Sequence, residues 1–154
     1  MKHELVKDWM TADVITIAPD VPLPQVHDLM SRHWIRRLPV VFEGQLVGII
    51  TLGDVREAES SDATSLNIWE LNYLIAKLQA HRVMTPKPIT ISPNDTIGEA
   101  TRLMLDHKIS GLPVVGEQSQ LVGIITESDI FRMLVQSWQE NDESVEEPIN
   151  MTSG

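Results

Sequence analysis

Two copies of one segment make up most of this chain. Sliding the sequence by 74 residues from Met10 to Glu43, and by 75 residues from Gln45 to Asp54, brings identical residues together at 23 of the 45 positions from 10 to 54. The extra residue of the second copy falls within 116–120, where a hairpin tip tolerates an insertion. A unit of about 55 residues buries only roughly 60% of its surface when it folds alone. We therefore expect two similar units that pack against each other.

Each copy predicts the same order of elements: strand, helix, strand, hairpin, strand and helix. The alternation Ile-Thr-Ile at 15–17 and 89–91 predicts a first strand, which a proline two residues later ends. Leu-Pro-Val-Val at 38–41 and 112–115 starts the second strand, because proline is tolerated at the beginning of a strand. The helix between them has one apolar face in each copy, formed by Leu23, Val26, Leu29 and Met30 and by Ile97, Ala100, Leu103 and Met104. The pattern predicts an α/β fold.

A Thr-x-x-Asp motif closes the last strand of each copy. Gly-Ile-Ile-Thr at 48–51 and at 123–126 is followed, after two residues, by Asp54 and Asp129, where a helical pattern begins. An Asp at a helix N-terminus accepts backbone N–H bonds and complements the helix dipole. The structural interpretation of the motif is therefore a pair of helix caps. The alternative is a ligand site that occurs twice.

The motif together with the preceding Leu-Pro-Val-Val and short hairpin, twice in one chain, resembles the cystathionine-β-synthase (CBS) domain. Two copies resemble the tandem pair called a Bateman module, and the resemblance covers about Val6 to Val135. The segment 66–74 is similar to the linker of stand-alone bacterial pairs of the acetoin-utilisation type. The resemblance implies two β-α-β-β-α units, related by an approximate twofold axis and joined by a linker helix. It also implies that the Thr and Asp hold the ribose of AMP, ADP, ATP or S-adenosylmethionine.

The resemblance further implies two composite clefts, each with the Thr-Asp pair of one repeat and the first strand of the other. Basic residues would contact phosphate and isoleucines would pack on adenine. One cleft is expected to use Thr51, Asp54, Arg36 and Arg37 with Ile89 and Ile109, and the other Thr126, Asp129, Ser110 and Gly111 with Ile15, Ile35 and Arg36. The cleft with both arginines should prefer phosphate-bearing ligands. The alternatives are ordinary core for Ile15 and Ile89, and a solvated or salt-bridged turn for the arginines.

The expected divisions of the chain are a first repeat over 1–64, a linker helix over 65–80, a second repeat over 81–138 and an acidic flexible tail over 139–154. Asn67 and Glu70 have the spacing of a capping box at the start of the linker helix, after a polar loop over 59–65. Five of the 22 acids lie between Glu140 and Glu147, in a segment poor in residues that pack. The tail is either a frayed helix end or an acidic docking arm.

Composition and motifs exclude several classes of function. A net charge of −10 disfavours nucleic acid as a partner, and no apolar run reaches the ~20 residues that span a bilayer. The charged N-terminus is not a secretory signal, which predicts a cytoplasmic protein. The chain has no cysteine and no nucleotide-hydrolase, dehydrogenase, metalloprotease or esterase motif, so we expect neither catalysis nor a metal. His33 and His107 are expected to stabilise helix C-termini, and the alternative is contact with a ligand.

Two hypotheses of function remain. The first is a regulatory module that binds an adenosine ligand, requires no other cofactor, forms a homodimer as its relatives do and acts on an unidentified protein. The second is a structural module for protein interaction or dimerisation whose clefts stay empty. Titration with adenosine compounds distinguishes them.

Overall fold

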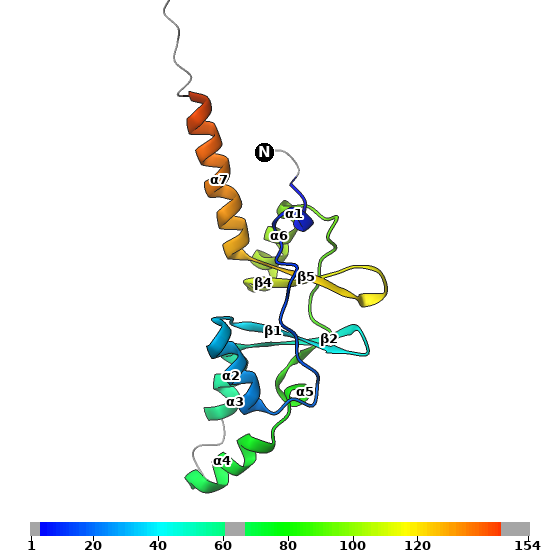
Figure 1. The fold of residues 1–154 in the computed structure, drawn as a ribbon, viewed down its shortest axis with the longest axis vertical. Helices are drawn as coiled ribbons and strands as arrows, with labels where there is room; N and C mark the ends of the chain where they lie inside the picture. Colours follow the sequence, from blue (N-terminus) through cyan, green and yellow to red (C-terminus); the bar gives the residue numbers. More distant parts are fainter. Residues whose placement is uncertain (1–3, 61–66, 146–154) are drawn as a thin grey trace, which may run out of the picture.

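The computed structural model describes residues 4–60 and 67–145, and these form two similar units (Figure 1). Both units contain a β-hairpin with a helix before it and a helix after it, which confirms the predicted α/β pair. The first unit has α2 (Leu23–His33), β1 (Arg37–Phe42), β2 (Gln45–Thr51) and α3 (Leu52–Ser60), and the second has α6 (Ile97–His107), β4 (Gly111–Val115), β5 (Leu121–Thr126) and α7 (Glu127–Val145). The remaining elements are α1 (Val6–Trp9), α4 (Ile68–Lys77), α5 (Ala80–Val83), β3 (Thr85–Pro86) and the 3-10 turn η1 (Glu117–Ser119).

The short segment that opens each copy packs on the opposite unit. Helix α1 inserts Val6 into the hydrophobic core of the second unit, and α5 inserts Ala80 into the core of the first. Thr11, after α1, pairs with Ile124 of β5, and β3, after α5, pairs antiparallel with β2. This exchange ties the two units together and places chain segments from both copies at the surfaces where the units meet.

The predicted first strand is reduced to a single bridging residue. Ile17 donates its N–H to the carbonyl of Pro39 at 3.1 Å and accepts the N–H of Val41 at 2.9 Å. To extend this parallel pairing toward the N-terminus, the residue at position 39 would have to donate an N–H to the carbonyl of Ile15. To extend it toward the C-terminus, the residue at position 19 would have to donate an N–H to the carbonyl of Val41. Both positions are proline. Proline has no N–H, so the ladder stops on both sides.

The second copy has the same arrangement. Ile91 bonds to Pro113 and Val115 at 3.1 and 2.9 Å, and prolines interrupt the ladder at the equivalent positions. The alternation Ile-Thr-Ile is typical of a strand. However, half of the N–H groups that the ladder lacks belong to prolines of the neighbouring strand, which the local pattern does not show. The backbone at Ile15 and Ile89 consequently stands outside both sheets.

The two hairpins differ at their tips, as the extra residue predicts. Glu43 and Gly44 have φ of 51° and 78°, so the first hairpin has the two-residue turn with two positive φ values that suits twisted strands. The second tip is longer and contains η1. Gln45 and Gln120 form a bridge, and Gln45 Nε2 donates to the carbonyl of Gln118 at 3.2 Å. The two tips therefore touch.

The linker helix is confirmed: the Asn67 side chain accepts the N–H of Glu70 at 2.9 Å and caps α4. Positions 61–65 of the predicted loop and 65–66 of the predicted linker lie outside the described residues. Helix α7 continues to Val145, so positions 139–145 of the predicted tail are helical, and 146–154 lie outside the described residues. Gln and Glu are good helix formers, and Gln136 donates to Glu140 at 3.3 Å. In the described part of the chain, none of the helices has the length and apolar character needed to cross a bilayer.

We expect Gly123→Ala to lower the free energy of unfolding by about 1–3 kcal/mol, because an added methyl group would overpack the contact between β5 and the exchanged segment. A Cβ at Gly123 would lie 2.7 Å from Met10 Sδ and 2.8 Å from the Thr11 carbonyl oxygen. The control is Gly98→Ala in α6, whose Cβ would meet Thr96 Oγ1 at 3.7 Å and should be neutral or stabilising. Urea unfolding followed by circular dichroism measures both. A Gly123→Ala variant as stable as the wild type would contradict this packing.

Candidate ligand-binding clefts

Two cavities lie beside the two Thr-x-x-Asp motifs, and both are lined by residues from both copies. The first, here the Asp54 cleft, has a volume of about 490 Å³, and the second, the Asp129 cleft, about 620 Å³. The Asp54 cleft is lined by Arg37, Ile49, Thr51, Asp54, Thr85, Lys87, Pro88, Ile89, Lys108, Ile109, Ser110, Gly111 and Pro113. The Asp129 cleft is lined by Thr11, Asp13, Val14, Ile15, Trp34, Ile35, Arg36, Arg37, Ser110, Ile124, Thr126, Glu127, Ser128 and Arg132. Both volumes suit a small molecule.

The site residues predicted from the sequence line one or both of these two cavities, with the exception of Asp129, which is buried beside the second cavity and lines neither. Gly111 was expected in the Asp129 cleft but lines the Asp54 cleft, and Arg36, which was expected in both clefts, lines the Asp129 cleft and not the Asp54 cleft. The cleft with both arginines is therefore the Asp129 cleft. Arg37 and Ser110 border both cavities. Arg36 and Arg37 are consecutive residues where β1 begins, and consecutive side chains of an extended chain point in opposite directions. One arginine is thereby separated from the Asp54 cleft.

The Asp54 motif forms a closed ring of two hydrogen bonds. The Thr51 N–H donates to Asp54 Oδ2 at 2.9 Å, and the Asp54 N–H donates to Thr51 Oγ1 at 3.1 Å. The helix-cap interpretation is thus confirmed at the start of α3. Within the described residues nothing donates to Asp54 Oδ1, and the side chain is only half-buried. This carboxylate oxygen is therefore available to accept a hydrogen bond from a ligand.

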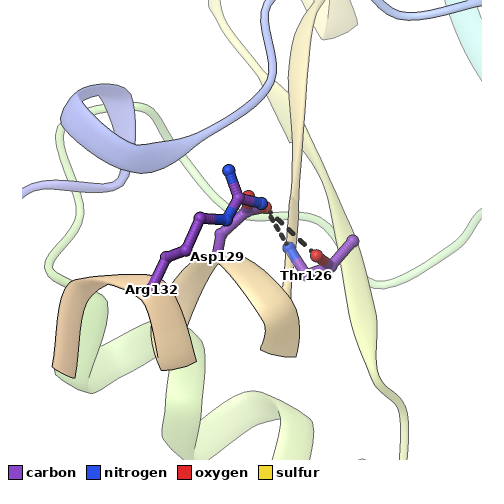
Figure 2. A network of polar contacts seen from close by, with 3 residues as sticks. All are labelled: Thr126, Asp129 and Arg132. Carbon is purple, nitrogen blue, oxygen red and sulfur yellow. Dashed lines mark hydrogen bonds and ion pairs between the residues drawn. The ribbon is translucent and has the colours of Figure 1, made fainter. Parts of the chain in front are cut away.

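The Asp129 motif differs because a third residue holds its carboxylate (Figure 2). Asp129 Oδ2 accepts the Thr126 N–H at 2.9 Å and the Thr126 hydroxyl at 3.1 Å, while Arg132 Nη2 donates to Asp129 Oδ1 at 2.6 Å. The Asp129 side chain is 2% exposed and that of Arg132 is 69% exposed. The first copy has Glu57 at the position of Arg132, so it lacks this ion pair. A ligand in the Asp129 cleft must share the carboxylate with Arg132 or displace it.

Arg37 lies between the clefts, close against the backbone of Gly111. A Cβ at Gly111 would be 2.7 Å from Arg37 Nε, so the glycine leaves the space that the arginine occupies. Burial lowers the pKa of Arg37; the charge of Glu127 opposes this effect and that of Arg36 reinforces it. A guanidinium stays protonated despite such a shift. Arg37 is therefore a partly desolvated cation that borders both cavities.

The lining residues that were not predicted include four at equivalent positions of the two copies. Lys87 and Lys108 line the Asp54 cleft, whereas Asp13 and Trp34 line the Asp129 cleft. The shift of 74 residues pairs Asp13 with Lys87 and Trp34 with Lys108. The alignment of the two copies therefore already showed these differences in charge. They lie outside residues 35–37, on which the prediction of two unlike clefts was based.

The described residues offer binding groups rather than a metal centre. No cluster of three or more His, Asp or Glu side chains that could hold a metal ion occurs among them. His33 and His107 end α2 and α6, as predicted, and line neither cleft. The clefts combine carboxylates, threonine hydroxyls, basic side chains and isoleucine side chains, which suits a ligand with a hydroxyl-rich part, a flat apolar part and a charged group.

Comparison with known proteins identifies the family. The model of the CBS domain matches residues 6–61 and 80–136. An uncharacterized protein of Methanocaldococcus jannaschii, MJ1225, is 35% identical over 138 residues, which are 85% of this chain and 47% of that protein. This chain thus spans about half the length of that relative.

Two crystal structures show the same arrangement of paired units. The CBS domain pair of protein MJ0100, in complex with 5′-methylthioadenosine and S-adenosyl-L-methionine, has a TM-score of 0.74 at 30% identity, covering 86% of this chain and 97% of that one. A protein of Vibrio cholerae assigned to acetoin utilization (AcuB) has a TM-score of 0.75 at 29% identity, covering 94% and 98%. With its duplicated sequence, its paired units and its two matches to the domain model, this chain belongs to the CBS-domain family and contains a tandem pair of these domains.

Proposed function

We propose that this protein is a regulatory module that binds adenosine compounds in the Asp54 and Asp129 clefts. The observation that carries the proposal is the position of each Thr-x-x-Asp motif, at the wall of a cavity of small-molecule size between the two units. The MJ0100 pair supports it, because both ligands in that crystal contain adenosine. The family relationship supports a regulatory role over a catalytic one.

The chemistry of the Asp54 cleft fits an adenosine compound part by part. Ribose hydroxyls would donate to the free oxygen of Asp54, next to the Thr51 hydroxyl. Ile89 and Ile109 line the same cleft and would cover the faces of adenine. In the Asp129 cleft, Thr126 and the isoleucines at 15 and 35 line the cavity and would have these roles, and the buried Asp129 would join them where a ligand displaces Arg132.

Ligand binding would be transmitted through the contact between the units. Each cleft is lined by both copies, so a bound molecule contacts both units at once. A ligand shifts the arrangement of the units only if it binds two arrangements with different affinity. We propose that this shift changes the activity of a protein partner, and that the module itself has no turnover.

A thermal-shift assay tests the binding. An adenosine ligand at about 100 times its Kd should stabilise the protein by ~2.7 kcal/mol, which raises Tm by about 5–10 °C for a chain of this size. The panel is AMP, ADP, ATP, adenosine, 5′-methylthioadenosine and S-adenosylmethionine, and GMP is the control that keeps ribose and phosphate but changes the base. No shift with any adenosine compound would favour the structural module with empty clefts.

We also propose that a second copy of this chain covers an apolar face of α7. Phe131, Val135 and Trp138 are exposed and lie at i, i+4 and i+7, on one face of the helix. We expect the double variant Phe131→Glu/Trp138→Glu to sediment as a monomer at a concentration where the wild type is a dimer. Trp69→Glu on the equally exposed α4 is the comparison. Dissociation by Trp69→Glu alone would locate the interface on α4 instead, and a monomeric wild type would refute the homodimer.

A further inference from the structure

The two clefts are built from equivalent chain segments, so their chemical differences can be compared position by position. Residues 11–15 and 34–37 border the Asp129 cleft, and the residues 74 positions later border the Asp54 cleft. The charge changes at four of these positions: Asp13 corresponds to Lys87 and Trp34 to Lys108, whereas Arg36 corresponds to Ser110 and Arg37 to Gly111. The first two changes make the Asp54 cleft more basic, and Arg37 borders both cavities. The two cavities are therefore formed by equivalent backbone segments but are lined by different charges.

The Asp54 cleft has an excess of positive charge. Its charged lining residues are Arg37, Lys87 and Lys108 on the basic side and Asp54 on the acidic side. Lys87 and Lys108 have φ of 46° and 54°, in the left-handed region that lysine rarely adopts. For Lys108 this is the C-cap of α6, as it is for Trp34 at the end of α2, and helices commonly end in this conformation. Asp54 neutralises one of the three basic side chains, so the lining of this cleft has a net positive charge.

In the Asp129 cleft, acids and bases balance. Arg36, Arg37 and Arg132 line it together with Asp13 and Glu127, and the buried Asp129 lies beside Arg132 at 2.6 Å. Part of the positive charge is therefore already paired, and two further carboxylates face the cavity. An anionic group placed here would meet these carboxylates as well as the arginines.

Trp34 adds an aromatic surface to the Asp129 cleft. The residue is 94% exposed, and its backbone is left-handed with φ of 56° at the C-cap of α2. A tryptophan ring attracts cations on its face, and sulfur groups contact aromatic rings favourably. Lys108, at the same position of the other cleft, offers an ammonium group instead.

Resting on the proposed binding of adenosine compounds, we infer that the two clefts select opposite 5′ substituents: the Asp54 cleft takes an adenosine compound with an anionic phosphate, and the Asp129 cleft one with an uncharged or cationic sulfur group. Lys87 and Lys108 are the specificity-determining residues of the first cleft, and Asp13 and Trp34 those of the second. The cavity geometry and the charge of the lining residues carry the assignment.

The test uses variants with a single working cleft and two probes, AMP and 5′-methylthioadenosine. Asp129→Asn leaves the Asp54 cleft, and Asp54→Asn leaves the Asp129 cleft. Calorimetry should show that the Asp129→Asn variant binds AMP more tightly than 5′-methylthioadenosine by about 10-fold or more, with the reverse order for Asp54→Asn. Adding Lys87→Asp to the first variant, or Asp13→Lys to the second, should reduce or reverse each preference.

Lys77→Asp on α4 is the matched control for Lys87→Asp, because it makes the same change of net charge outside both clefts. It should leave both preferences unchanged. Trp34 is the tryptophan that lines a cleft, so Trp34→Phe should remove the fluorescence change caused by 5′-methylthioadenosine.

Two results would overturn the assignment. One is the same order of preference in both clefts, and the other is an equal loss of AMP affinity from Lys77→Asp and Lys87→Asp. Failure of every adenosine compound to bind the wild type is a different outcome, since it would refute the proposed function itself.

Discussion

Asp54→Asn is expected to weaken AMP binding in the Asp54 cleft by about 10- to 150-fold while leaving Tm close to that of the wild type. The asparagine carbonyl oxygen can still accept the Thr51 N–H, and the Thr51 hydroxyl can still accept the N–H of residue 54. The substitution removes the negative charge, however, and places an amide donor where ribose hydroxyls need an acceptor. Charge-assisted hydrogen bonds of this kind contribute roughly 1.5 to 3 kcal/mol each. Calorimetry and thermal unfolding measure the two effects separately.

The companion variant Asp54→Ala separates the two interpretations of the motif. It removes both the acceptor of the Thr51 N–H and the ligand contact, so it should lower stability by about 1 kcal/mol as well as affinity. If Asp54→Asn binds AMP as tightly as the wild type, the motif is a helix cap and nothing more. Asp129 is a less clean target, because its buried carboxylate also holds Arg132.

Arg37→Ala should cost phosphate-bearing ligands about 10- to 150-fold in affinity and adenosine about threefold or less. The guanidinium is partly desolvated, borders the Asp54 cleft and can pair with phosphate through two parallel hydrogen bonds. Adenosine has no group for it to contact. Competition of AMP and adenosine for the same cleft, in the Asp129→Asn background, gives the ratio.

Arg102→Ala is the control for this prediction, because Arg102 is an exposed residue of α6 that borders neither cleft. It should change neither affinity. An equal loss for AMP and adenosine in Arg37→Ala would mean that the arginine supports the fold of the cleft rather than contacting phosphate.

The duplication allowed most of the fold to be predicted. The repeated apolar patterns gave the order of elements, and the single insertion located the longer hairpin tip. The exchange of Val6 and Ala80 between units was missed, because a short amphipathic segment carries no signal of which unit it packs on. The first strands were overestimated for a related reason: the donor missing from the ladder at Ile17 belongs partly to Pro39, which is distant in sequence.

The sequence predicted which residues contribute to the two clefts, but not in every case which cleft each residue lines. Arg36 was expected in both clefts from the family resemblance, but consecutive side chains of an extended chain point in opposite directions, and Arg36 lines the Asp129 cleft and not the Asp54 cleft. The ion pair between Asp129 and Arg132 follows an i, i+3 spacing that is readable on a helix, yet only comparison with Glu57 in the first copy makes it informative. Residues that contact each other across the two units require the structure.

Calorimetric titration of the wild type and of the double variant Asp54→Asn/Asp129→Asn with AMP and 5′-methylthioadenosine tests the central proposal most directly. We expect saturable binding of at least one of these compounds to the wild type. We expect no detectable binding to a double variant that still unfolds cooperatively. Binding that persists undiminished in the double variant would contradict the assignment of the clefts, and the absence of binding to the wild type would contradict the function.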